Sequence, residues 1–254
     1  MYKTTLLLLV LPCWLAAKEL VICGTIETPL KWLNSAQQPQ GLDIDIVTTI
    51  FKSLNVPINI KLTNSGARLT RDAQTGACDM VLSHSYKVER EAYLIYPKQA
   101  HLLLNWYFFI RKTDIANIHY NTLADLKPWR IGITKAFSYT PELTALRHDP
   151  NYQFQEIPLN QLQLRKLLAH RVDVVPMQFI TALAQIKSEG WQEQLSYLPQ
   201  PLKSSPYFNA WSRASINEQT RDLMERYDAQ LLQMKRDGRL NAIYQRYDIP
   251  YIEP

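Results

Sequence analysis

Two spacings of hydrophobic residues alternate along the chain. Short apolar runs bounded by Gly, Pro or polar residues have the length and composition of β-strands. Between them lie longer segments with apolar residues every three or four positions, the spacing of one helical face. The expected strands are Glu19–Gly24, Ile58–Leu62, Asp79–Leu82, Leu102–Ile110, Trp129–Thr134, Val172–Met177 and Tyr207–Ser212. This alternation predicts an α/β fold, with a mixed, mostly parallel sheet flanked by helices.

Local signals mark where the expected helices begin and end. Asp43 is expected to cap the first helix, and Asp45 to favour the positive end of its dipole. The two aspartates could also form a catalytic pair, but capping explains both and is the favoured interpretation. The other expected helices are Ala67–Thr75, Asn121–Leu126, one from Pro141, Leu162–His170, Phe179–Glu189 ended by Gly190, and a long one opened by a capping box at Ser215–Glu218 and ended by Gly238.

The first 17 residues have the pattern of a secretory signal peptide. Lys3 supplies the positive start, Leu6–Leu11 the apolar core, and Ala16-Ala17 the small residues before cleavage. The apolar run is too short to span a bilayer. Cys13 could indicate a lipoprotein, but Pro12 before it fits a lipidation signal badly. The pattern predicts an exported, periplasmic protein cleaved near Ala17.

Composition and charge exclude some classes of function. The chain has 254 residues, 46% of them hydrophobic, which is enough for a sizeable core. The net charge of +5 falls to +4 in the mature chain, because Lys3 is the only charged residue removed. No basic run or aromatic-basic alternation indicates nucleic-acid binding. The mild positive charge favours an anionic ligand.

Two cysteines remain after cleavage, Cys23 and Cys78. Each stands beside a predicted strand, and the two strands are expected to be neighbours. Parallel neighbours in a sheet seldom have the geometry for a bridge, so buried free thiols are favoured, with a disulfide in the exported protein as the alternative. The cysteines do not have metal-ligand spacing, and we expect no metal and no cofactor.

The segment from Gly76 to Pro97 carries the chemistry that is easiest to interpret. The polar residues Ser83, His84 and Ser85 follow a buried strand, and Arg90 comes shortly after them. Open α/β sheets bind ligands at the carboxyl ends of their strands, where Arg90 could hold a carboxylate through two parallel hydrogen bonds. On spacing alone, a surface arginine paired with a neighbouring glutamate is the favoured interpretation.

Several phrases resemble family 3 periplasmic solute-binding proteins, the polar amino-acid binders of ABC importers. They are Gly76-Ala77-Cys78-Asp79 before the strand, Lys87-Val88-Glu89-Arg90 after it, Gly41-Leu42-Asp43-Ile44-Asp45, and the ending Asp237-Gly238 with Ile243-Tyr244-Gln245-Arg246-Tyr247. The resemblance covers the whole mature chain. It implies a two-lobed periplasmic binding protein-like fold, with lobe 1 at 18–104 plus 205–254, lobe 2 at 105–204, and two hinge crossings between them.

The resemblance also implies a set of site residues. Arg90 corresponds to the arginine that holds the ligand's α-carboxylate. Gln178 stands where the family has an aspartate for the ligand's ammonium, which leaves recognition of an ammonium open, and Glu27 is a possible substitute. The remaining candidates, for hydrogen bonds, the walls or the rim of the cleft, are Ser83, His84, Ser85, Ser138, Phe137, Trp32 and Arg68.

Two functions are compatible with these features. The favoured one is a monomeric, non-catalytic binder that closes on a small carboxylate-bearing solute and serves an ABC importer or a membrane sensor. The alternative is an enzyme similar to exported cyclohexadienyl dehydratases, with Glu27 as general acid. A nucleophile elbow, a His-x-x-x-His pair and a Gly-rich phosphate loop are all missing from the sequence.

Overall fold

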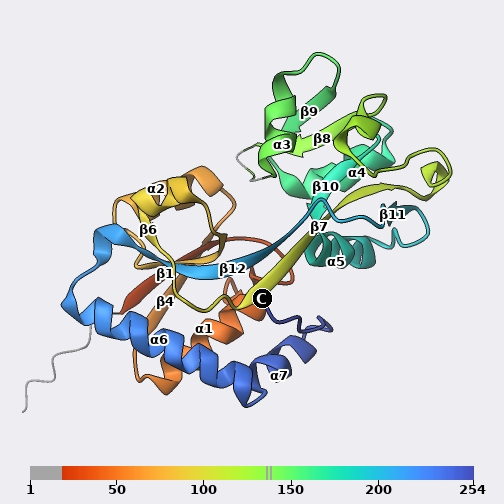
Figure 1. Ribbon diagram of the computed structural model, residues 1–254. Helices are drawn as coiled ribbons and strands as arrows, with labels where there is room; N and C mark the ends of the chain where they lie inside the picture. The colour runs from red at the N-terminus through yellow and green to blue at the C-terminus, as the bar shows by residue number, and fades with distance from the viewer. Residues whose placement is uncertain (1–18, 136, 138) are drawn as a thin grey trace, which may run out of the picture.

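The computed structural model describes residues 19–254 except 136 and 138. The expected signal peptide and Ser138 lie outside the described residues. Two α/β lobes lie side by side and are joined by two long strands, β7 and β12 (Figure 1). No helix in the described part of the chain is long and apolar enough to cross a membrane.

Lobe 1 is built on a sheet that combines strands from the first and the last part of the described chain. Its core strands are β1 (Leu20–Thr25), β4 (Ile58–Thr63) and β5 (Met80–Ser85), and β1 pairs in parallel with both of the others. The late strand β12 (Lys203–Ser212) adds to β5 in the antiparallel direction. The short strands are β2 (Trp32–Leu33), β3 (Pro39–Gln40) and β6 (Leu94–Ile95).

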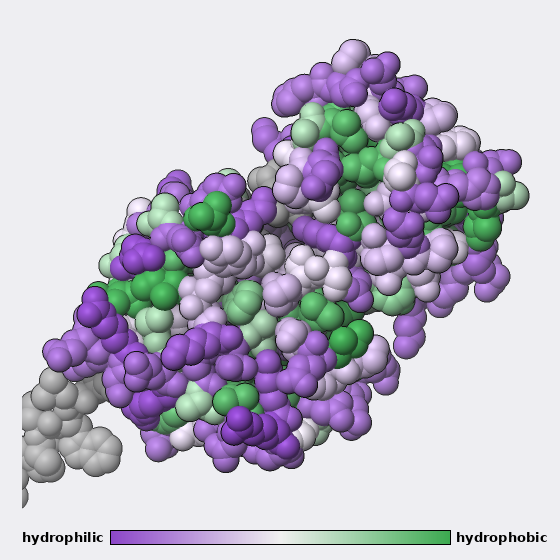
Figure 2. Space-filling view, in the orientation of Figure 1, coloured by the Kyte–Doolittle hydropathy of each residue, from purple (hydrophilic) through white to green (hydrophobic). Residues whose placement is uncertain are grey.

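Helices cover both faces of this sheet (Figure 1). On one face, α1 (Leu42–Ser53), α6 (Glu218–Arg236) and α7 (Arg239–Gln245) form the largest core cluster. On the other face, α2 (Gly66–Gln74) packs over β1 and β5. Helix α6 is amphipathic, with buried Leu223, Tyr227 and Leu231 on one side, and its charged side faces solvent as a hydrophilic band in Figure 2. Burial of that apolar face, rather than intrinsic helix propensity, holds such a helix in place.

Lobe 2 contains parallel β8 (Arg130–Thr134) and β9 (Gln153–Ile157), then β10 (Val175–Gln178) and β11 (Leu195–Tyr197). Its helices are α3 (Pro141–Ala145), α4 (Gln163–Leu168) and α5 (Phe179–Glu189). The sequence pattern placed most of these elements within a few residues but missed β9 and β11. Among the described residues, the 3-10 helices are η1 (Val88–Ala92), η2 (Lys112–Asp114), η3 (Leu123–Leu126), η4 (Leu146–His148), η5 (Asn160–Leu162) and η6 (Arg213–Ser215).

The two connecting strands belong to one continuous sheet. Strand β7 (Leu102–Arg111) pairs with β12 in the antiparallel direction, from Tyr207 opposite Leu102 to Lys203 opposite Trp106. Further along β7, β10 pairs on one side, and the strand order is β10-β7-β12-β5-β1-β4. The crossings are therefore a hydrogen-bonded ribbon, and the sheet continues from one lobe into the other.

The expected cap of α1 is wrong. Gly41, not Asp43, occupies the N-cap position, and no side chain caps this end. Gly41 has φ 128°, a conformation that favours glycine, and a Cβ there would collide with the Leu30 carbonyl. Asp43 is instead fully buried and belongs to a charged network described below. At the long helix α6, the capping side chain is Asn217, which accepts from the Thr220 N–H, rather than Ser215.

The expectation of free thiols is also wrong, because Cys23 and Cys78 form a disulfide with Cα atoms 5.9 Å apart. Cys78 lies before the first residue of β5 and is not part of the ladder, in which Cys23 is opposite Val81. The constraint on neighbouring parallel strands therefore does not apply to this pair. The bridge lies in the core between α2 and the sheet.

Loss of this bridge should destabilise the protein. The disulfide joins residues 55 positions apart, and closing a loop of this size restricts the unfolded chain by about 2–4 kcal/mol. We expect dithiothreitol to lower the free energy of unfolding by that amount in urea titrations. The double variant Cys23→Ala/Cys78→Ala should match the reduced protein and be insensitive to reductant. An unchanged wild-type midpoint under reducing conditions would contradict the bridge.

Candidate functional site: a pocket between the lobes

A cavity of about 150 Å³ lies where β5, β7 and β12 meet the loops of both lobes. A cavity of similar volume in another protein accommodates a benzene molecule, so this one has room for a small organic solute. Its lining residues come from both lobes and are Thr25, Glu27, Gly66, Ala67, Leu69, Thr70, Ser83, His84, Ser85, Arg90, Trp106, Phe137, Gln178 and Tyr207. A wider space of about 570 Å³ shares Thr25, Glu27, Gly66 and Phe137 with it and extends along α5.

A bulge in β5 determines how the serines lie. The register between β5 and β12 shifts opposite Asn209, and Ser83 has φ 52°, which is unusual for a residue with a Cβ. The Asn209 side chain stabilises the bulge by accepting from the Ser83 N–H at 3.1 Å. The Ser83 hydroxyl consequently donates to buried Asp43, so Ser83 borders the pocket while its hydroxyl is already engaged.

Arg90 is held at the pocket by the strand end. Its Nη1 donates to the Ser85 carbonyl oxygen at 2.8 Å and lies 3.3 Å from the Ser85 hydroxyl. The Tyr96 hydroxyl donates to the same carbonyl at 2.9 Å. These contacts orient the guanidinium, a planar group whose chemistry allows two parallel hydrogen bonds to a carboxylate.

Two lysines add positive charge near Arg90. The Lys203 ammonium lies 4.7 Å from the centre of the Trp106 ring. Burial, followed by repulsion from Lys87 and Arg90, lowers the pKa of Lys203 to about 8. The pKa of Lys87 is likewise lowered, by burial and then by Arg90. These three side chains, the cationic cluster, stand close enough to repel one another.

His84 is a neutral member of the pocket wall. Burial, followed by the charge of Arg90, lowers the pKa of His84 to about 3, so its imidazole is uncharged at neutral pH. Its Nδ1 lies 3.1 Å from the Leu82 carbonyl oxygen, and Nδ1 must therefore carry the proton. The other ring nitrogen, Nε2, is then an acceptor.

Aromatic residues of the two crossing strands form the apolar wall. The Trp106 Nε1 donates to the Tyr207 hydroxyl at 3.3 Å, and Phe137 packs edge-on against Trp106 with ring centres 6.2 Å apart. Trp32, expected as an aromatic wall, instead packs against Tyr247 near the C-terminus, 6.1 Å between ring centres. Trp106 lies in a long apolar run of the sequence, a pattern typical of core residues, and only 2% of its surface is exposed.

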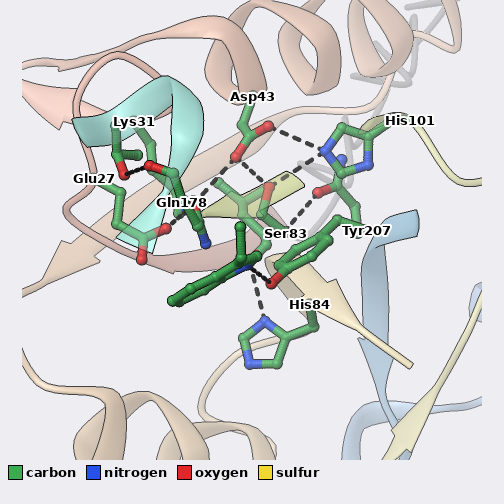
Figure 3. Close-up of polar contacts among 12 residues, drawn as sticks. Glu27, Lys31, Asp43, Ser83, His84, His101, Gln178 and Tyr207 are labelled. Carbon is green, nitrogen blue, oxygen red and sulfur yellow. Dashed lines mark hydrogen bonds and ion pairs between the residues drawn. The ribbon is translucent and has the colours of Figure 1, made fainter. Parts of the chain in front are cut away.

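Behind the pocket lies a buried charged network (Figure 3). The Lys31 ammonium contacts the carboxylates of Glu27 at 3.0 Å and Asp43 at 3.3 Å. The other Asp43 oxygen is 3.0 Å from His101 Nε2. Although burial favours a neutral Asp43, the charge of Lys31 and the hydrogen bonds with His101 and Ser83 lower its pKa to about 2. Burial opposes the charge on Lys31 as well, but Glu27 and Asp43 outweigh it and raise the Lys31 pKa.

Ser83, His101 and Asp43 do not form a nucleophilic triad. In a triad, one ring nitrogen receives the serine proton while the other faces the carboxylate. Here the same nitrogen, His101 Nε2, lies 3.3 Å from the Ser83 hydroxyl and 3.0 Å from Asp43. The Ser83 hydroxyl contacts Asp43 directly, and Asp43 and His101 are fully buried. This arrangement holds charges in place and has no relay toward a substrate.

The structure brings most of the predicted site residues to the pocket, but not all. Those that line it are Glu27, Ser83, His84, Ser85, Arg90, Phe137 and Gln178. Arg68 lies on the exposed face of α2, 3.6 Å from Asp72, and is not a lining residue. Trp32 is also outside the lining. In residues 19–254 as described, no group of His, Cys, Asp or Glu is arranged to hold a metal ion.

Several residues of the site were missed by sequence reasoning. Trp106, Tyr207 and Lys203 come from β7 and β12, and Trp106 is in register with both Gln178 and Lys203. That juxtaposition depends on pairing between strands far apart in sequence. The buried partners Lys31 and His101 were missed as well, because each is an isolated polar residue in its local sequence.

The model of the bacterial extracellular solute-binding proteins, family 3, matches residues 21–249. The chain therefore belongs to this family, as the resemblance predicted. No match is found among curated protein sequences.

Solved structures show the same fold. A histidine kinase sensor domain with similarity to periplasmic binding proteins has a TM-score of 0.79 at 16% identity, covering 94% of this chain and 99% of that chain. An ancestral arginine-binding protein bound to arginine has a TM-score of 0.75 at 20% identity, covering 91% of this chain and 98% of that chain. An ancestral amino acid-binding protein, a precursor of cyclohexadienyl dehydratase, has a TM-score of 0.71 at 17% identity, covering 90% of this chain and 95% of that chain. These likenesses confirm the two-lobed periplasmic binding protein-like fold.

Proposed function

We propose that this protein binds a small carboxylate-bearing solute in the pocket between its lobes, without chemical turnover, by closure of the lobes about the β7–β12 ribbon. The observation that carries the proposal is Arg90, oriented by Ser85 at the end of β5 and facing a cavity of about 150 Å³. Lobe 1 is proposed to span 18–104 plus 205–254, and lobe 2 to span 105–204. Residues from both lobes line the cavity, so a bound solute would favour the closed arrangement.

We further propose that the protein is exported to the periplasm, acts as a monomer, and presents its solute to an ABC importer or a membrane sensor. The disulfide supports export, because such bonds persist in oxidising compartments. Family membership supports uptake or sensing, and the likeness to a sensor domain keeps the second role open.

A thermal-shift screen tests the proposal. Amino acids, dipeptides and small mono- and dicarboxylates would each be added to the mature protein. A ligand at a hundredfold excess over its Kd should stabilise the folded state by about 2.7 kcal/mol. A stabilising carboxylate whose effect disappears when its acid is esterified supports the proposal. Stabilisation only by uncharged or cationic compounds would contradict it.

The enzyme alternative is tested separately. Glu27 is the only acidic residue among the described lining residues, and its Oε2 already accepts from Lys31 at 3.0 Å. A general acid needs a proton directed at the substrate. We therefore expect no product from prephenate or arogenate in chromatographic assays. Turnover that disappears in Glu27→Gln would overturn the binding-only function.

Cleavage of the signal peptide is a further expected result. Mass spectrometry of the exported protein should find Lys18 at or near the new N-terminus, because Ala16-Ala17 are the small residues after the apolar core. A lipid-modified Cys13 as the first residue would show that the chain is processed as a lipoprotein instead.

A further inference from the structure

Positive charge around the pocket exceeds negative charge. Arg90 lines the pocket, and the Lys203 ammonium lies 4.7 Å from the ring centre of Trp106, another lining residue. The charges of Lys87 and Arg90 both lower the pKa of Lys203. Against these three stands Glu27, the sole acid among the lining residues that the structure describes. Its carboxylate is already engaged by Lys31 at 3.0 Å. A ligand with two carboxylates would place both of its negative charges beside these cations.

Gln178 points to what the pocket does not bind. It is the last residue of β10, borders the pocket and is only 5% exposed. Its Oε1 is buried and finds no hydrogen-bond partner among the described residues. An unpaired buried acceptor is costly, and a ligand hydroxyl at this position would satisfy it. A neutral amide offers no charge to balance an ammonium, and desolvating that ammonium beside the cationic cluster is unfavourable.

We infer that the pocket selects small dicarboxylates that carry a neutral hydroxyl where an amino acid carries its ammonium. This inference rests on the proposed function, with one carboxylate at Arg90. The second carboxylate would approach Lys203, and the hydroxyl would donate to Gln178. The cavity of about 150 Å³ suits a chain of four or five carbons. Both acidic groups would then lie against the cationic cluster.

Matched pairs of ligands isolate the hydroxyl from the ammonium. Calorimetric titrations would compare L-malate with L-aspartate, L-2-hydroxyglutarate with L-glutamate, and L-lactate with L-alanine, since each pair shares one carbon skeleton. We expect the tighter-binding hydroxydicarboxylate to exceed its amino partner by at least about tenfold in affinity. Lactate should bind more weakly than malate, because it lacks the second carboxylate.

Substitutions assign the two preferences to residues. Gln178→Glu places a carboxylate of nearly the same shape in the pocket and should narrow or reverse the preference for the hydroxy acid. Gln200→Glu, an exposed glutamine that contacts the Asn121 carbonyl, is the matched control and should leave the ratio unchanged. Lys203→Gln should weaken malate more than lactate, because only malate has a carboxylate left for that lysine.

The outcomes separate the inference from the function beneath it. Tighter binding of aspartate or glutamate than of the hydroxy partners, in an Arg90-dependent manner, would overturn the inference and leave the proposed function standing. An unchanged ratio in Gln178→Glu would likewise overturn it. Absence of saturable binding by all six compounds would count against both the inference and the carboxylate-binding function.

Discussion

Replacement of Arg90 by alanine should abolish most of the affinity for the solute. The guanidinium borders the pocket and is oriented by the Ser85 carbonyl at 2.8 Å. Truncating one partner of a buried, hydrogen-bonded charge pair costs about 2–5 kcal/mol, which corresponds to a loss of roughly 30- to 5,000-fold. Arg90→Lys should recover only part of the affinity, because an ammonium cannot form the two parallel bonds of the guanidinium.

Calorimetric titration of the best carboxylate from the screen would measure this loss. Arg68→Ala is the matched control, because Arg68 belongs to the same lobe but is exposed and lies against Asp72 outside the pocket. The affinity of the Arg68→Ala variant for the carboxylate should stay within about twofold of wild type, as expected when an exposed ion pair is removed. Circular dichroism should show all the variants folded. Equal affinities in wild type, Arg90→Ala and Arg90→Lys would place the centre of the site elsewhere.

The largest expected effect on stability is at Asp43. Asp43→Asn keeps the shape of the side chain but removes the charge that Lys31 contacts at 3.3 Å and His101 at 3.0 Å. Breaking a buried pair by changing one partner costs about 3–5 kcal/mol, because the remaining charge stays buried. Urea titration should show the free energy of unfolding reduced by that amount. The matched control is Asp45→Asn on the same helix, whose contacts with Arg246 and Tyr247 are partly exposed and worth about 1 kcal/mol or less. Similar losses in the two variants would contradict the special role of the buried network.

Acid should act through the same carboxylate. The pKa of Asp43 is lowered from 3.8 to about 2 in the folded protein, so its contribution is fully present above the unfolded value of 3.8. That contribution, on the order of 2 kcal/mol, is lost as the pH falls through the folded value. The difference in unfolding free energy between wild type and Asp43→Asn should therefore shrink between pH 5 and pH 2. A constant difference over that range would show that Asp43 does not titrate as the network implies.

Hydrophobic spacing and local signals predicted most of the elements, because those signals act over a few residues. Helix α5, for example, begins at Phe179 and ends before Gly190 as expected, with Gly190 in the left-handed conformation that ends helices. The site was predictable only in part. Arg90 and Gln178 were found because the resemblance to the family identifies both positions, one shortly after β5 and the other at the end of β10. Lys203 and Trp106 meet only through pairing of β12 with β7, which local patterns do not reveal.

The prediction that Asp43 caps α1 was wrong for a physical reason. An aspartate near a helix start is most often explained by capping. Its actual environment depends on Lys31 and His101, which reach it from a loop and from the segment before β7. Nothing in the local sequence distinguishes a capping carboxylate from one that is buried between distant partners. Free thiols were predicted for a similar reason. Cys78 lies in the turn before β5, and this position, which the local pattern does not reveal, brings it within bonding distance of Cys23.

The β7–β12 ribbon also affects the order in which the lobes can be completed during synthesis. Trp106 and Lys203 are paired but roughly a hundred residues apart, and lobe 2 is the segment between them. Lobe 2 can therefore form its contacts as soon as that segment has been made. Lobe 1 must wait for β12 and α6, and until then β5 has an unpaired edge. An unpaired edge strand invites pairing with another chain, so a protein shortened before β12 should aggregate even though its first half is intact.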